Sequence, residues 1–323
     1  MSNLKSSDNN LALTRALRYL KSLQNENGFW PYLPNREGAL EPSGWAAIAC
    51  RDDQSCLSSF SKGLLQNQNG DGGWSNDSAR IDSDWSTALA LLALRQAGIR
   101  ETSPGIFQKA CKKGEDWLLE NRAEYYTSGA RFALLIWKGP EYSYPQGWPW
   151  SKNTYGWVEP TAYVLLSFRQ SEQAKKEEVA QVLEQAEDFL INLCCKDGGW
   201  NFGDQTPFGR LYPPDVQSST LAILALQTRK DDFRVKQSLK WLSERVGSME
   251  SVSEMSWAML ALSSSGENCN ELIQKLLARQ ADDGSFSSNV LTQSVACLAF
   301  ETVIGDSPPD LASMHLSSMR GKK

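Results

Sequence analysis

Acidic and amide side chains stand at the start of each long apolar segment of the chain. A carboxyl group in apolar surroundings keeps its proton to higher pH, and nearby hydrogen-bond donors stabilise the anion that remains after proton transfer. Such a group is suited to act as a general acid. Capping of a helix N-terminus favours the same residue types at the same place and accounts for most of them. The residues concerned are Glu41, Asp82, Asp84, Glu159, Asp215, Gln217, Glu254 and Gln293.

Aromatic side chains are the second group with chemical potential, since the chain has 12 tryptophans among its 323 residues. The face of an aromatic ring attracts a desolvated cation by about 2 kcal/mol or more. The competing explanation is packing, which we favour for Trp30, Trp74 and Trp200 because they belong to a sequence repeat. The candidates for contact with a cationic or apolar substrate are Trp45, Trp85, Trp148, Trp150, Tyr155, Trp157, Tyr163 and Trp257.

Composition excludes several classes of function. The single histidine, His315, lies in a polar segment near the C-terminus, so histidine-based metal sites and triads are not expected. We expect neither a metal nor a cofactor. A net charge of −5 and a pI near 5.2 argue against a nucleic-acid surface.

Cysteine usage and the N-terminus indicate a cytoplasmic protein. The seven cysteines are scattered without CxxC spacing, which suggests reduced thiols and not a disulfide framework. The polar first ten residues have no apolar core of the kind that a signal peptide needs. No apolar run approaches the roughly 18 residues of a membrane span.

A repeat with the pattern Q-x3-G-x-W/F punctuates the chain. Its clearest copy is Gln68–Trp74, and two of the four copies are imperfect. Four copies of one short motif indicate a repeated architecture and not one local turn. The other copies are Gln24–Trp30, Cys194–Trp200 and Gln280–Phe286.

The segments between these motifs predict helices in pairs. Six amphipathic segments, starting with 11–23, alternate with six segments that are apolar on nearly every face. We therefore predict one all-α domain over residues 1–323, an (α/α)6 double-ring barrel with apolar helices inside and polar tails at about 1–10 and 302–323. A linear helical solenoid is the alternative. Parallel inner helices would bring their acidic starts to one mouth.

The longest irregular segment, residues 125–158, is rich in aromatic residues and predicts a lid or a cavity wall at that mouth. Its apolar part, Ala130–Trp137, is the best candidate for peripheral membrane contact. A second long connection covers residues 201–214.

Residues Arg15–Trp30 match the full pattern K/R-G/A-x2-aromatic-L-x3-Q-x3-G-x-W, and Ala186–Trp200 matches most of it. This pattern resembles the QW motif of squalene–hopene and oxidosqualene cyclases, the class II terpene cyclases. Those enzymes normally join two α-barrel domains, whereas this chain has residues for one. The resemblance therefore implies a single-domain cyclase that protonates and cyclises a linear polyprenyl chain, with no metal.

The resemblance also implies a catalytic acid, and here the chain departs from the family. The family motif D-x-D-D-T donates its proton from the middle aspartate, but the matching register here is Asp215-Val-Gln217-Ser218-Ser219. Glutamine cannot protonate an alkene. We place Asp84 first as a substitute, oriented by Asp82, because Asp82-Ser-Asp84 keeps the D-x-D spelling; Glu159, Glu41 and Asp215 are rivals by position.

A prenylated aromatic acid, such as a geranylgeranylated hydroxybenzoate, is the favoured substrate, because no acidic cluster for a metal-bound diphosphate is evident. Arg131, Arg210 or Lys152 would meet its carboxylate. Two other functions stay open. A subunit like the β subunit of protein prenyltransferases would need a zinc-binding histidine, and a non-catalytic barrel would bind an isoprenoid or a partner without an acid.

Overall fold

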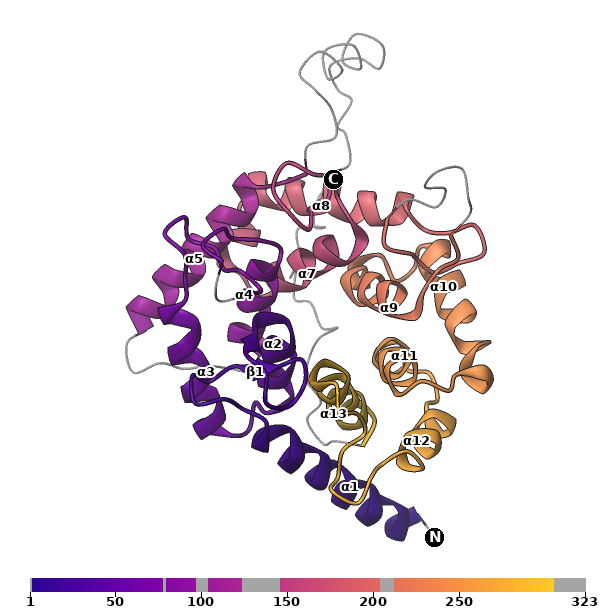
Figure 1. Ribbon diagram of the computed structural model, residues 1–323. Helices are drawn as coiled ribbons and strands as arrows, with labels where there is room; N and C mark the ends of the chain where they lie inside the picture. Colours follow the sequence, from indigo (N-terminus) through magenta and orange to yellow (C-terminus); the bar gives the residue numbers. More distant parts are fainter. Residues whose placement is uncertain (1, 78–79, 97–103, 124–145, 204–211, 305–323) are drawn as a thin grey trace.

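The computed structural model describes residues 2–77, 80–96, 104–123, 146–203 and 212–304. Six helices form an inner ring, in which each helix packs against the next and the last packs against the first (Figure 1). They are α2 (Leu40–Ala49), α4 (Ser86–Gln96), α7 (Val158–Phe168), α9 (Val216–Ala225), α11 (Val252–Ser264) and α13 (Val290–Ile304). The predicted (α/α)6 double ring is confirmed, and the linear solenoid is wrong.

Six further helices surround this ring and alternate with the inner helices along the chain. They are α1 (Ser2–Ser22), α3 (Gln54–Gln66), α5 (Pro104–Glu120), α8 (Glu177–Asn192), α10 (Phe233–Ser243) and α12 (Asn270–Leu277). Because α1 already begins at Ser2, the separate polar tail predicted for residues 1–10 is wrong for residues 2–10. The other predicted tail lies outside the described residues from 305 onward.

Small elements complete the connections. Strands β1 (Trp30–Pro31) and β2 (Gly38–Ala39) pair antiparallel just before α2. Short 3₁₀ helices follow some of the longer helices: η1 (Glu172–Lys175) follows α7, η3 (Gln227–Arg229) follows α9, and η4 (Val246–Ser248) follows α10.

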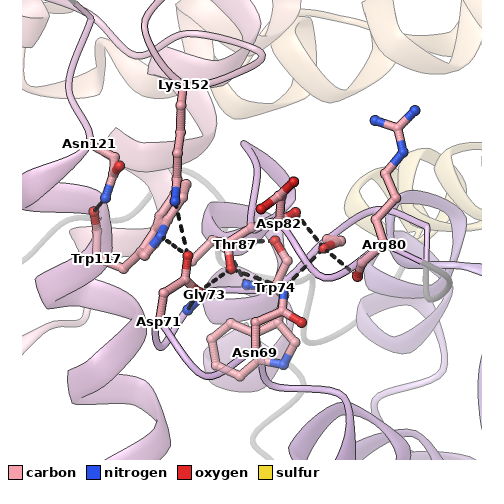
Figure 2. A network of polar contacts seen from close by, with 12 residues as sticks. Asn69, Asp71, Gly73, Trp74, Arg80, Asp82, Thr87, Trp117, Asn121 and Lys152 are labelled. Carbon is pink, nitrogen blue, oxygen red and sulfur yellow. Dashed lines mark hydrogen bonds and ion pairs between the residues drawn. The ribbon is translucent and has the colours of Figure 1, made fainter.

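The tryptophan that ends three of the four repeats holds an outer helix to the next inner helix. The Trp74 backbone N–H donates to the Thr87 hydroxyl in α4 at 2.8 Å (Figure 2). The Trp74 indole donates to the Leu64 carbonyl at the end of α3, also at 2.8 Å. The same pair of contacts joins Trp30 to Leu20 and Ser43, and Trp200 to Leu190 and Ser219. Burial of these donors makes their partners obligatory. Trp30, Trp74 and Trp200 are therefore architectural, as predicted.

The glutamine present in three of the four motifs ties neighbouring repeats together. Gln68 donates both to the Gly72 carbonyl of its own turn, at 2.7 Å, and to the Ala110 carbonyl of α5, at 2.9 Å. Gly72 has a φ of +96°, a backbone conformation that favours glycine. Gln280 of the last copy donates to the Ala12 carbonyl of α1 at 2.9 Å. This contact fastens the end of the chain to its beginning and closes the outer ring.

Candidate functional site

Three inner helices share one position that differs from all the others in the helix. Every residue of α2 is buried except Glu41, every residue of α7 except Glu159, and every residue of α9 except Gln217. Each lies two residues before the hydroxyl that receives the repeat tryptophan: Ser43, Thr161 and Ser219. The repeat therefore places three polar side chains at equivalent points of the ring, each in the first turn of its helix.

Glu159 is held by the neighbouring inner helix. The Ser218 hydroxyl donates to its Oε1 at 3.1 Å, and the Gln217 amide lies 3.4 Å from its Oε2. Burial, followed by the negative charges of Asp215 and Glu41, raises the pKa of Glu159 to about 7. A carboxyl with this pKa is partly protonated at neutral pH, and the two donors from α9 stabilise the anion that it leaves.

Glu41 has a different environment, built from residues outside the inner ring. The Tyr32 hydroxyl donates to Glu41 Oε2 at 2.5 Å, and the Asn76 amide donates to the Tyr32 hydroxyl at 3.1 Å. Asn76 Oδ1 also accepts the backbone N–H of Glu41 at 2.8 Å. Burial raises the pKa of Glu41, and the hydrogen bond from Tyr32 opposes this shift. Burial and the nearby Glu41 raise the pKa of Tyr32, so the phenol remains a donor.

Asp84, placed first as the acid, has the contacts of a helix cap. Its Oδ1 accepts the backbone N–H of Ser86 at 2.9 Å, and its Oδ2 accepts that of Asn76 at 3.1 Å. Both contacts hold backbone N–H groups at the start of α4 and of the segment before it. Asp82 is exposed (Figure 2). The Ser75 hydroxyl donates to its backbone carbonyl at 2.7 Å. The capping interpretation therefore explains the contacts of Asp84.

Asp215 is the N-cap of α9, where its Oδ1 accepts the backbone N–H of Ser218 at 2.8 Å. Burial raises its pKa, while the hydrogen bonds from Ser218 and Gln217 oppose the shift. Its charge is close enough to raise the pKa of Glu159. Asp215 thus orders the start of α9 and supports the protonated form of Glu159.

An aromatic cluster lies one helical turn below the glutamates. Trp45 follows Glu41 by four residues and Tyr163 follows Glu159 by four, so each ring lies on the same helix face as its carboxyl. The rings of Trp45 and Trp257 meet edge to face at 5.1 Å, and Trp45 lies 6.2 Å from Tyr163. Trp85 stacks on Tyr163 at 5.4 Å, and Trp150 meets Trp85 at 4.7 Å. Five of the eight predicted aromatic residues therefore form one group.

The remaining three have other surroundings. Trp148 repeats the architectural contacts, since its indole donates to the Leu118 carbonyl and its backbone N–H to the Thr161 hydroxyl. The substrate role predicted for Trp148 is therefore replaced by a role in packing. Trp157 precedes α7 and its ring lies 6.2 Å from Phe202, while the Tyr155 side chain is 63% exposed.

Several of the expected contacts with substrate fall elsewhere. Lys152 forms an ion pair with Asp71 at 3.1 Å and lies over the Trp117 ring, so its charge is already partnered (Figure 2). Arg131 and Arg210 lie outside the described residues, as do most of the predicted lid and the apolar stretch Ala130–Trp137.

A groove of about 180 Å³ lies beside the Glu41 cluster, not over the aromatic rings. It is lined by Phe29, Gly38 of β2, Leu40 and Leu64, and by residues 66–69, 74–77, 80 and 81. Asn76 belongs both to this lining and to the hydrogen-bond chain that reaches Glu41 through Tyr32.

Two further properties concern the part of the chain that the structure describes. It contains no group of three or more histidine, cysteine, aspartate or glutamate side chains arranged to hold a metal ion. None of its helices has the length and apolar character needed to cross a bilayer.

Comparison with known proteins shows a partial family match and a shared fold. Residues 81–209 match the squalene-hopene cyclase C-terminal domain, which confirms the resemblance found in the sequence for this part of the chain. A comparison with curated protein sequences finds no match. The chain therefore resembles the class II terpene cyclases in sequence over residues 81–209 and has the α/α barrel of that class.

Among solved structures, the type II terpene cyclase MstE from Scytonema, in complex with geranylgeranyl dihydroxybenzoate, matches with a TM-score of 0.65. It is 12% identical, and the match covers 94% of this chain and 99% of that one. An α-1,6-mannanase of Salegentibacter matches with a TM-score of 0.63 and 10% identity, and the match covers 91% of this chain and 98% of that one. An α-amylase from Clostridium perfringens matches with a TM-score of 0.63 and 14% identity, and the match covers 90% of this chain and 97% of that one. At these identities the likeness shows the fold alone.

Proposed function

We propose that this protein is a class II terpene cyclase, in which Glu159 protonates a terminal carbon–carbon double bond of a linear polyprenyl substrate. The observation that carries the proposal is the position of Glu159 at the start of an inner helix, with its anion stabilised by Ser218 and Gln217. In the family motif D-x-D-D-T the acid lies two residues before the threonine. Glu159 lies two residues before Thr161, so it occupies that position on α7.

The protonation state of Glu159 supports this role. Alkene protonation needs a neutral carboxyl that is poised to lose its proton, and a pKa near the working pH meets both requirements. Burial and the charges of Asp215 and Glu41 bring the pKa of Glu159 to about 7. Gln217, at the position of the acid on α9, then acts as a hydrogen-bond donor to Glu159 and not as a proton source.

The aromatic cluster supports the steps that follow protonation. A carbocation must be stabilised without a nucleophile that would capture it, and aromatic faces satisfy this condition. Trp45, Tyr163 and Trp257 are fully buried, and Trp85 and Trp150 extend the group toward the surface. Trp45 and Tyr163 lie one helical turn after Glu41 and Glu159 on the same inner helices, where the prenyl chain would fold.

The substrate class follows from MstE, which binds geranylgeranyl dihydroxybenzoate. A geranylgeranylated hydroxybenzoate, converted to a polycycle, is therefore the first substrate to test. The mannanase and the amylase share the fold, so the fold does not decide between the two chemistries. The match to the squalene-hopene cyclase domain and the buried aromatic cluster favour the cyclase. A non-catalytic isoprenoid-binding barrel is the alternative.

The experiment compares wild type with Glu159→Gln on geranylgeranyl dihydroxybenzoate at pH 7. Loss of the acid should lower turnover by about 10²–10⁴-fold, because the amide cannot donate a proton to an alkene. Glu254→Gln is the matched control, since Glu254 also lies in the first turn of an inner helix but is exposed. Retained turnover in Glu159→Gln would remove Glu159 as the acid. A wild type that binds prenyl substrates without converting them would favour the non-catalytic barrel.

A further inference from the structure

Glu41 and Glu159 are two largely buried carboxyl groups with different hydrogen-bond partners and different neighbouring charges. Glu159 is close enough to Glu41 for the negative charge of Glu41 to raise its pKa. Tyr163, one turn below Glu159, feels the charges of both glutamates. The two groups therefore border the same aromatic cluster, one from α2 and the other from α7.

The hydrogen bonds around Glu41 favour an anion with a fixed orientation. Its Oε2 accepts the Tyr32 hydroxyl at 2.5 Å, a distance typical of a bond to a charged oxygen. Asn76 fixes the phenol from behind by donating to its oxygen at 3.1 Å, so the phenol hydrogen is directed to Glu41. By contrast, the charges of Asp215 and Glu41 favour the neutral form of Glu159. Neighbouring carboxyl groups with such different environments take opposite roles as acid and base.

We propose that Glu41 is the base that ends the cyclisation, with Tyr32 and Asn76 as its positioning residues. This inference rests on the proposed function. The O–H bond of Glu159 breaks at the start and its proton forms a C–H bond with the alkene. At the end a C–H bond next to the last cationic carbon breaks, its electron pair forms the new double bond, and the proton forms an O–H bond with Glu41. The substrate is thereby isomerised with no other reactant.

The cycle closes when the proton on Glu41 returns to Glu159 by exchange with solvent. The groove of about 180 Å³ brings solvent to Asn76, which contacts both Tyr32 and the Glu41 backbone. Glu41 therefore lies between the aromatic cluster, where the proton is taken up, and a solvent-lined groove. Asp84 binds the Asn76 backbone and so keeps this arrangement in place.

The test compares the product spectra of Glu41→Gln, Glu159→Gln, Tyr32→Phe and the control Glu254→Gln on geranylgeranyl dihydroxybenzoate. Because Glu41 donates no proton in the first step and acts on Glu159 through its charge alone, Glu41→Gln should still consume substrate, at a rate within about tenfold of wild type. Its main product should change to double-bond isomers or water-capture products. Tyr32→Phe should give the same new products in smaller amount, and Glu41→Asp should restore part of the original ratio.

The outcomes separate this inference from the proposed function. An unchanged product spectrum in Glu41→Gln, with Glu159→Gln inactive, overturns the role of Glu41 alone. Loss of consumption in Glu41→Gln as complete as in Glu159→Gln also overturns it, because Glu41 would then belong to the acid. A wild type that converts no prenyl substrate, or an active Glu159→Gln, removes the proposed function itself.

A measurement without substrate tests the same assignment. Carbon-13 NMR of protein labelled at the glutamate side-chain carboxyl follows each group, and the two glutamine variants assign the signals. Glu41 should lose its proton at lower pH than Glu159, and Tyr32→Phe should move the Glu41 titration to higher pH. If Glu41 keeps its proton to higher pH than Glu159, the free protein does not combine a charged Glu41 with a neutral Glu159, and the inference is wrong.

Discussion

The protonated form of Glu159 links folding to pH at the scale of a single residue. Its pKa is about 7 in the folded protein, against 4.5 for the free side chain. The folded state therefore holds a proton that the unfolded chain releases over this interval. The stabilisation is present in full below about pH 4.5 and is lost as the pH rises through 7, because the folded protein must then bury the anion.

Replacing Glu159 by glutamine should therefore stabilise the protein at alkaline pH. A shift of about 2.5 in pKa corresponds to roughly 3 kcal/mol, so between pH 5 and 8 the free energy of unfolding of wild type should fall by about 2–3 kcal/mol more than that of Glu159→Gln. Urea unfolding of both proteins at the two pH values measures the difference. Glu254→Gln should follow wild type. Parallel curves for wild type and Glu159→Gln would contradict the raised pKa.

The sequence predicted the candidates for this site but not their order. Glu159 was among the five acids, yet the D-x-D spelling placed Asp84 and Asp82 first, whereas we propose Glu159 as the acid. The informative register is the distance to the hydroxyl that binds the repeat tryptophan, and by that measure Trp85 stands in the acid position of α4, two residues before Thr87. Tyr32 and Asn76 left no signal, because their contacts join residues far apart in the chain.

A threonine hydroxyl attaches each of the inner helices α4 and α7 to the backbone of a preceding tryptophan. The Thr87 hydroxyl accepts the Trp74 backbone N–H at 2.8 Å and donates to the Trp74 carbonyl at 3.1 Å. Thr161 accepts the Trp148 backbone N–H in the same way. These contacts are buried, so a valine of nearly the same shape would leave the backbone N–H of the tryptophan without its partner.

Thr87→Val should lower the free energy of unfolding by about 1–3 kcal/mol, the cost of a buried polar group without a partner. Thr14→Val is the control, because Thr14 is exposed and its hydroxyl donates only to the Asn10 carbonyl of its own helix, at 2.8 Å. Its effect should stay within about 0.5 kcal/mol. Chemical denaturation of both variants measures the change in the free energy of unfolding. Equal changes would show that the buried hydroxyl stabilises the protein no more than the exposed one.

At the scale of elements, periodicity predicted the inner and outer helices well, because an apolar segment of the ring must be buried on all sides. The sequence pattern did not predict that Trp148 makes the same contact as the repeat tryptophans. Trp148 precedes Thr161 by 13 residues, the spacing that also separates Trp30 from Ser43 and Trp74 from Thr87. The long insertion before Trp148 removes the glutamine and the usual spacing to the outer helix, so the motif could not be recognised from its letters.

The closed ring makes the first and last repeats dependent on each other. Arg51, just after α2, forms a two-pronged ion pair with Glu301 of α13, with both N–O distances at 2.5 Å. The two side chains are only 14% and 12% exposed. Burial raises the pKa of Glu301, and the charge of Arg51 opposes the shift. This pair lies at the junction that a linear solenoid would lack.

Arg51→Met should therefore weaken the whole protein and not one repeat. Removing one partner of a buried pair leaves the other charge uncompensated, which costs about 3 kcal/mol. Lys112→Met is the matched control, since Lys112 pairs with Asp116 on the surface, where the two side chains are 64% and 41% exposed. That loss should cost less than about 1 kcal/mol.

The shape of the unfolding curve distinguishes a closed ring from a linear solenoid. In a solenoid each repeat contacts only its neighbours, so a weakened end melts first and the remainder follows. In this barrel α13 packs on α2, and Gln280 and Gln293 bind the carbonyls of Ala12 and Ala16 in α1. Arg51→Met should consequently melt at lower temperature but in one transition, with circular dichroism and tryptophan fluorescence changing together. Separate transitions for the two signals would mean that the ring opens at this junction while the other repeats stay folded.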